Sequence, residues 1–191
     1  MSNLTIILVR HGEKPGGDFP GEGTAVDGSE DDKSLVVRGW QRPGAWAALF
    51  GSGLGGPDYA VPAIVYAAAP DANKDDSRRP FETSGPTANR LNQDPVVTWA
   101  VGQEDELVAD ITKLTGVVAV FWEHKAIAKA IIPALCGNQR LPGVPLKWDP
   151  DRFDIALRFD RATPNNPWSF RQLSPRLLSG DTDAPMSKVM A

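Results

Sequence analysis

Three short apolar runs constrain the fold of this chain more than any other feature of its sequence. They cover residues 4–9, 63–68 and 117–122, and none of them alternates with polar residues. Runs of this kind predict strands that are covered on both faces, as in a parallel sheet. Each run is followed by polar residues and then by a helical pattern, an order that is typical of α/β proteins.

The remaining segments complete the predicted fold. Helical spacing of apolar residues indicates helices over residues 35–50, 80–91, 105–114 and 126–135. Pro43 is expected in or near the first turn of the first helix, or to kink it. Residues 153–160 and 168–173 alternate as an antiparallel hairpin does, and residues 96–101 predict a short strand. We therefore expect one domain over residues 1–191, a three-layer α/β/α sandwich whose mostly parallel sheet has an antiparallel edge.

Composition constrains the function more loosely. The 191 residues carry a net charge of −4, so we expect no binding to nucleic acid or to a membrane surface. No apolar run approaches the length that crosses a bilayer, and the first strand lacks the flanks of a signal peptide. With Cys136 as its single cysteine, the chain is expected to be cytoplasmic. Residues 15–34 predict a long acidic loop, and the polar tail from residue 179 is expected to fray.

Charged residues follow each predicted strand, directly after the first and third strands and in the loop after the second. The three segments are Arg10-His11-Gly12-Glu13-Lys14, Ser77-Arg78-Arg79 and Glu123-His124-Lys125. Because ligands of open parallel sheets bind beyond the carboxyl ends of the strands, we expect these segments to meet at one edge. Both histidines of the protein are among them.

Cations gathered around two histidines suit the transfer of a dianionic phosphoryl group. A neutral imidazole can attack phosphorus and divide the displacement into two steps through a covalent intermediate. Arginine offers a planar fork that matches phosphate oxygens. Catalysis of this kind depends mainly on positioning and electrostatic stabilisation, so we expect neither a metal ion nor an organic cofactor.

The same residues carry a resemblance to a known family. LVRHGEKP resembles the signature of the histidine phosphatase superfamily, which has the phosphoglycerate-mutase-like fold. RGWQRPGAWAALF resembles that family's Arg-Gly-x-Gln helix, and YAAAPDANKDDSRRPFETSGPTANRL resembles its strand, Ser-x-Arg loop and Thr-bearing helix. VVAVFWEHKAI resembles the strand that delivers the second histidine. The four segments stand in the family's order and cover most of residues 4–135.

The resemblance implies a role for these residues. His11 is expected to be the nucleophile that carries the phosphoryl group. Other residues are expected to complete the phosphate pocket and contact the substrate: Arg10, Arg79 and His124, with Glu13 and Lys14 at the rim. Arg79 is preferred to Arg78 because it stands two residues after Ser77 and at the start of a helix, where an anion is favoured.

The sequence constrains the general acid least. A leaving alkoxide needs a proton, so a carboxyl group is expected on the side of the phosphorus opposite His11. One branch of the resembling family uses an Asp after the second histidine, but Lys125 occupies that position here. In the mutase-like branches a Glu follows the Ser-x-Arg helix, and we expect Glu104 to be the acid. The alternatives are Asp105, Glu106, Glu123 and Asp18.

The sequence therefore predicts a histidine acid phosphatase-type enzyme that hydrolyses a phosphate monoester of a small molecule or a phosphoprotein. The first alternative is a mutase or phosphotransferase of the same family. That activity needs a second anion site, and no additional basic cluster is evident in the sequence. The second alternative is a non-catalytic phosphate-binding or scaffold protein that keeps the pocket but lacks the acid.

Overall fold

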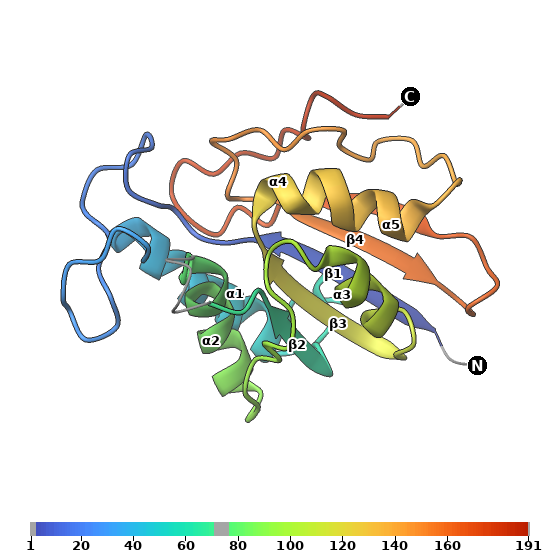
Figure 1. Ribbon diagram of the computed structural model, residues 1–191, viewed down its shortest axis with the longest axis horizontal. Helices are drawn as coiled ribbons and strands as arrows, with labels where there is room; N and C mark the ends of the chain where they lie inside the picture. Colours follow the sequence, from blue (N-terminus) through green and yellow to red (C-terminus); the bar gives the residue numbers. More distant parts are fainter. Residues whose placement is uncertain (1–2, 71–76, 191) are drawn as a thin grey trace.

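A five-stranded mixed sheet forms the centre of the computed structural model, which describes residues 3–70 and 77–190 (Figure 1). The strands are β1 (Leu4–Arg10), β2 (Ile64–Ala67), β3 (Gly116–Trp122), β4 (Ala156–Arg161) and β5 (Ser169–Leu173). Their order is β2-β3-β1-β4-β5. β3 pairs in parallel with both β1 and β2. β4 pairs antiparallel with β1 and with β5, and these two strands form the antiparallel edge. The predicted α/β fold and its antiparallel edge are confirmed, but the sheet is mixed, with two parallel and two antiparallel pairings, and not mostly parallel.

The helices occur near the predicted positions, with shifted ends. They are α1 (Val37–Gly51), the short 3₁₀ helix η1 (Pro57–Tyr59), α2 (Arg79–Arg90) and α3 (Glu104–Ile111). The last helical segment is continuous and consists of α4 (His124–Ala126), a π-helical turn η2 (Ile127–Ile131) and α5 (Ile132–Cys136). Pro43 lies inside α1, beyond its first turn.

Residues of β1 divide their side chains between two hydrophobic clusters on opposite faces of the sheet. Leu4, Ile6 and Leu8 belong to a cluster with α3 and the α4–α5 segment. Ile7 and Val9 belong to a second cluster with residues of α1 and α2. Every residue of β1 is buried, because helices or loops cover both faces, and this explains why its sequence does not alternate.

Three predictions about segments outside the sheet have different outcomes. Residues 96–101 do not form a strand: Val96 makes one isolated parallel bridge to Tyr66, and the chain then turns at residues 101–102 towards α3. The described part of the tail packs on the protein and is not frayed, since Met186 is buried and the backbone at Val189 bridges to Pro145. Residues 15–34 do form a long loop, whereas part of the loop between β2 and α2 lies outside the described residues.

Two glycines allow the segment after β1 to pack directly on α1. A Cβ atom on Gly12 would lie 2.6 Å from the carbonyl oxygen of Gly39, and one on Gly39 would lie 2.3 Å from that of Glu13. Both distances are shorter than a carbon and an oxygen atom tolerate. The backbone that follows the nucleophile candidate is therefore fixed against the helix by the absence of two side chains.

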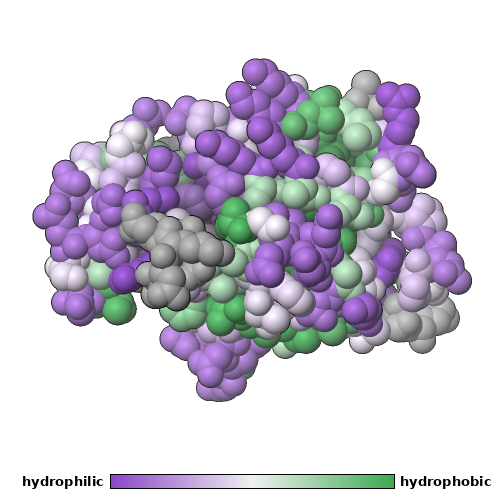
Figure 2. Space-filling model, viewed as in Figure 1, coloured by the Kyte–Doolittle hydropathy of each residue, from purple (hydrophilic) through white to green (hydrophobic). Residues whose placement is uncertain are grey.

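The surface is mostly hydrophilic around α4, whereas apolar side chains gather lower in the view, over α2 and β2 (Figure 2). None of the helices in the described part of the chain is both long and apolar enough to cross a membrane.

Candidate active site

A cavity of about 290 Å³ lies beyond the carboxyl ends of β1, β2 and β3. We call it the strand-end cavity. Its charged and titratable lining residues are His11, Lys14, Arg79, Glu123, His124 and Lys125. The segments after all three parallel strands therefore meet at one edge of the sheet, as the sequence predicts.

His11 directly follows β1 and is held in one orientation. Its backbone amide donates to the carbonyl of Trp122 at 3.2 Å, and its Nδ1 lies 2.7 Å from the carbonyl oxygen of Gly12. Because a carbonyl oxygen only accepts, Nδ1 carries the proton and Nε2 holds the lone pair. Burial, together with the nearby Arg10 guanidinium, holds the pKa of His11 well below its ordinary value of 6.5. The ring is therefore a neutral imidazole with Nε2 available as a nucleophile.

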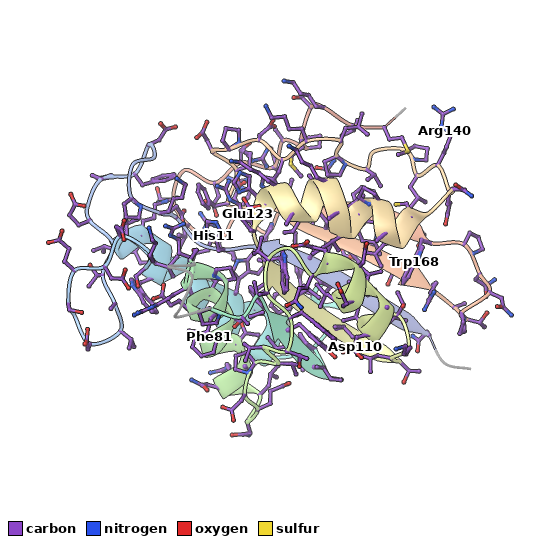
Figure 3. The ribbon with its side chains drawn as sticks, in the orientation of Figure 1. His11, Phe81, Asp110, Glu123, Arg140 and Trp168 are labelled. Carbon is purple, nitrogen blue, oxygen red and sulfur yellow. The ribbon has the colours of Figure 1, made fainter. Side chains whose placement is uncertain are left out.

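His124 begins α4 and faces His11 across the cavity. The two ring centroids are 6.3 Å apart, and the rings are nearly perpendicular. Nδ1 of His124 lies 2.6 Å from Oε1 of Glu123, although the two atoms are not aligned as in an ideal hydrogen bond. Figure 3 shows Glu123 beside His11 at the ends of β3 and β1. The cavity thus contains two imidazoles and one carboxylate.

The Glu123 carboxylate is ionised near neutral pH. Burial raises its pKa, but contacts with His124 and with the amides of Lys125 and Ala126 outweigh that effect and lower the pKa to about 2. Its Oε2 also accepts a hydrogen bond from the amide of Ala126 at 2.8 Å and caps α4. Glu123 is therefore fixed by the helix that carries His124.

Arg10, the last residue of β1, is buried and only partly satisfied. Its Nη1 donates to the carbonyl oxygens of Pro150 at 2.5 Å and of Arg152 at 3.1 Å, and its guanidinium stacks 3.7 Å from the Phe153 ring centroid. Its buried Nε has no hydrogen-bond partner among the described residues. Burial lowers the pKa of Arg10 to about 10, and it stays charged at neutral pH. Arg10 lines an adjoining cavity, which also contains Lys14 and His124.

Arg79 is the first residue of α2, and Pro80 follows it into the cavity wall. Nε and Nη2 of Arg79 donate to the carbonyl oxygens of Ser34 and Asp32, at 3.2 and 2.9 Å. These bonds attach the end of the acidic loop to the site. Burial lowers the pKa of Arg79. Arg78, by contrast, is exposed and pairs with Asp31, which agrees with the preference for Arg79.

Thr83 connects α2 to the segment that holds His11. Its Oγ1 accepts from the amide of Gly12 at 2.9 Å and donates to the carbonyl of Arg79 at 2.6 Å. Thr83 is fully buried. One hydroxyl thus fixes the distance between the first turn of α2 and the end of β1.

Glu13 is not at the rim of the cavity, contrary to expectation. Its carboxylate is fully buried, accepts from Nη2 of Arg42 at 2.6 Å and from Nε of Arg38 at 3.1 Å. Arg42 also pairs with Asp181 at 2.8 Å. The close packing at Gly12 and Gly39 turns Glu13 towards α1, so it stabilises the fold beneath the site instead of contacting a ligand.

Glu104 does not line the strand-end cavity either, so the geometry does not support its expected role as the acid. Its carboxylate accepts from Nε1 of Trp122 at 2.9 Å and from the amide of Gly102 at 2.9 Å. Both carboxylate oxygens therefore accept hydrogen bonds within the protein, at the start of α3. Asp105 and Glu106 are exposed, and Asp18 lines the adjoining cavity with Arg10. Glu123 is the one carboxylate among the described residues that line the strand-end cavity.

Sequence reasoning missed the residues between α5 and β4 that contact Arg10. Phe153 and the carbonyl groups of Pro150 and Arg152 belong to an irregular segment. Backbone carbonyls carry no sequence signal, and Phe153 looks like any apolar residue that precedes a strand. Among the described residues, no group of three or more His, Cys, Asp or Glu side chains is placed to hold a metal ion.

Comparisons with known proteins give a fold and no family. No protein-family model matches the sequence, and no curated protein matches it. Among solved structures, the chain is similar to one named "Mycobacterial hydrolase 2", with a TM-score of 0.52 and 15% sequence identity over 90% of each chain. At this identity the likeness supports an α/β fold with this topology and says nothing about the reaction.

Proposed function

We propose that the protein is a metal-independent phosphatase of the histidine phosphatase superfamily, with that family's three-layer α/β/α sandwich. It hydrolyses a phosphate monoester through a phosphohistidine on His11. The hydrogen bond from Nδ1 of His11 to the Gly12 carbonyl carries this proposal, because it leaves Nε2 unprotonated in a cavity lined by cations. The similar solved structure is named a hydrolase, which is consistent with the proposal.

In the first step, Nε2 of His11 attacks the phosphorus atom. The P–N bond forms as the P–O bond to the leaving group breaks, and negative charge gathers on the three equatorial oxygens. Arg79, Lys14 and the start of α2 lie where they can stabilise that charge. The buried, unpartnered Nε of Arg10 is a further donor that a bound oxyanion would satisfy.

The pair of His124 and Glu123 supplies the proton. With its Nδ1–H held against the ionised Glu123, His124 in its imidazolium form donates the proton on Nε2 to the leaving oxygen and becomes the neutral ring. In the second step a water molecule attacks the phosphohistidine, and the same pair accepts its proton. Inorganic phosphate then leaves, and His11 returns to its neutral form.

A panel of alkyl phosphates and p-nitrophenyl phosphate, assayed in the presence of EDTA, tests this function. We expect hydrolysis of several esters, and a loss of roughly 10³-fold or more in His11→Ala. Glu123→Gln should slow alkyl esters by about 10²–10⁴-fold but spare the nitrophenyl ester, whose leaving group hardly needs a proton. Absence of hydrolysis on every ester, or full activity of His11→Ala, would overturn the proposal.

A further inference from the structure

A second cavity, of about 210 Å³, shares His124 and Lys125 with the strand-end cavity. We call it the lysine cavity. Its other principal lining residues are Lys129, Lys147, Trp148 and Pro150. This cluster is not evident in the sequence, because Lys147 lies far along the chain from the other two lysines and joins them through the fold.

The charges of the lysine cavity are unbalanced. Its three lysine side chains form no hydrogen bond or ion pair with any described residue, and none of the described residues that line it is a carboxylate. Elsewhere in the described chain several arginines have carboxylate partners, as Arg42, Arg152 and Arg158 do. In a protein whose net charge is −4, three such cations around one hollow form a local anion-attracting surface.

The backbone segments that carry the lysine cavity are anchored to the core by buried side chains. Lys125 and Lys129 stand on the helix formed by α4 and η2, which the buried side chains of Ile127 and Ile131 fix to the sheet. The ring of Trp148 is buried, and its Nε1 donates to the carbonyl of Arg152 at 2.8 Å. Like charges one helical turn apart repel each other, so this arrangement costs stability unless an anion offsets it. π-helical turns such as η2 frequently occur at functional sites.

We infer that the lysine cavity binds a second anionic group of the substrate. The substrate is then a small molecule with two phosphate groups, one placed between His11 and His124 and the other among Lys125, Lys129 and Lys147. The two cavities together have the size of a site for a small metabolite, which argues against a phosphoprotein. This inference rests on the proposed function of the strand-end cavity.

A double variant tests the inference in the assembled enzyme. The measurement is the ratio of kcat/KM for propane-1,3-diol bisphosphate to kcat/KM for propyl phosphate. We expect Lys129→Gln with Lys147→Gln to lower this ratio about ten- to a hundredfold, mainly through KM. The control is Lys113→Gln with Arg140→Gln, which removes the same charge from two exposed positions outside both cavities; Figure 3 places Arg140 far from His11. An equal ratio in both double variants, or no preference for the bisphosphate in the unaltered protein, would overturn the inference.

Binding of analogues that cannot be hydrolysed separates this inference from the proposed function. By calorimetry, propane-1,3-bisphosphonate should bind more tightly than propylphosphonate, and the lysine double variant should lose the difference. If that holds while no ester is hydrolysed, the anion site stands and the phosphatase proposal fails. If monoesters are hydrolysed while both phosphonates bind equally, the phosphatase stands and the second site fails.

The anion in the lysine cavity could instead belong to a separate acceptor molecule, to which a phosphotransferase would pass the phosphoryl group. Incubation with p-nitrophenyl phosphate and propane-1,3-diol monophosphate distinguishes the two. Release of inorganic phosphate without bisphosphate supports a single doubly charged substrate. Formation of propane-1,3-diol bisphosphate would overturn that assignment and make the lysine cavity an acceptor site.

Discussion

Two groups of charged side chains flank His11, and they differ in how their charges are satisfied. On the α1 side, the side chains of Glu13, Arg42 and Asp181 are all buried, and Arg42 pairs with both carboxylates. On the cavity side, Arg10 keeps a buried Nε without a partner, and Lys125 has no ion pair among the described residues. Every charge of the first group has a partner within the protein, whereas in the second the buried Nε of Arg10 has none among the described residues. Under the proposed function, this difference separates charges that stabilise the fold from charges that bind the substrate.

The largest effect that this comparison predicts is on stability. Arg42→Ala leaves Glu13 and Asp181 buried without their principal cation, so the free energy of unfolding should fall by about 3–5 kcal/mol. Equilibrium unfolding in denaturant measures this loss of stability. The control is Arg171→Ala, which breaks an exposed pair with Asp58 and should cost about 1 kcal/mol or less. Similar losses in both variants would mean that the buried cluster does not stabilise the fold.

Glu104 gives the next effect, and it should also be structural. Glu104→Ala leaves Nε1 of Trp122 and the amide of Gly102 without their acceptor, which should cost about 1–3 kcal/mol in the free energy of unfolding. Activity at a temperature where the variant is folded should fall equally on alkyl and aryl phosphates. Glu106→Ala, at an exposed position on the same turn, is the control and should change stability by about 0.5 kcal/mol at most. A loss confined to alkyl esters would restore Glu104 as the acid.

His11 lies between the two groups and predicts a pH dependence of stability. Its pKa is lowered in the folded protein, so below its ordinary value of 6.5 the unfolded chain binds more protons than the folded one. The stability contributed by the neutral ring is present above that pH and is lost as the pH falls towards the lowered pKa. Over this interval the protein should lose about 1.4 kcal/mol per pH unit more than His11→Asn does. Parallel pH profiles of unfolding in the two proteins would contradict this assignment.

Lys14 should give the smallest stability effect and a measurable binding effect. It lines the strand-end cavity and has no ion pair with a described residue, so Lys14→Gln should change the free energy of unfolding by about 0.5 kcal/mol or less. The inhibition constant of inorganic phosphate should rise about three- to tenfold, because one cation at the anion is lost. A destabilised variant with unchanged phosphate inhibition would place Lys14 with the structural charges.

Much of the fold and the centre of the site could be predicted from the sequence. The runs that became β1, β2 and β3 are apolar throughout because both faces of the sheet are covered. Parallel strands bring the residues after them to one edge, and so His11, Arg79 and His124 line one cavity. In these cases the local sequence pattern and the position in the folded protein require the same kind of residue.

The failures concern side-chain direction and pairing across the chain. Glu13 follows His11 by two residues, but the glycine contact with α1 turns it away from the cavity. Glu104 begins the expected helix, yet Trp122 captures its carboxylate. Asp181 lies in a tail whose polar sequence resembles a frayed end, and its pairing with Arg42 becomes visible only in three dimensions. Sequence patterns give no direct measure of such partners.

The covalent intermediate is the central claim, and trapping it is the most direct test. The protein is mixed with a substrate that carries a radioactive phosphoryl group, quenched in alkaline detergent, and digested for mass spectrometry. We expect label on His11 that survives alkali and is lost in acid, as phosphohistidine is, and no label in His11→Ala. Label that survives acid, or that remains in His11→Ala, would contradict the account.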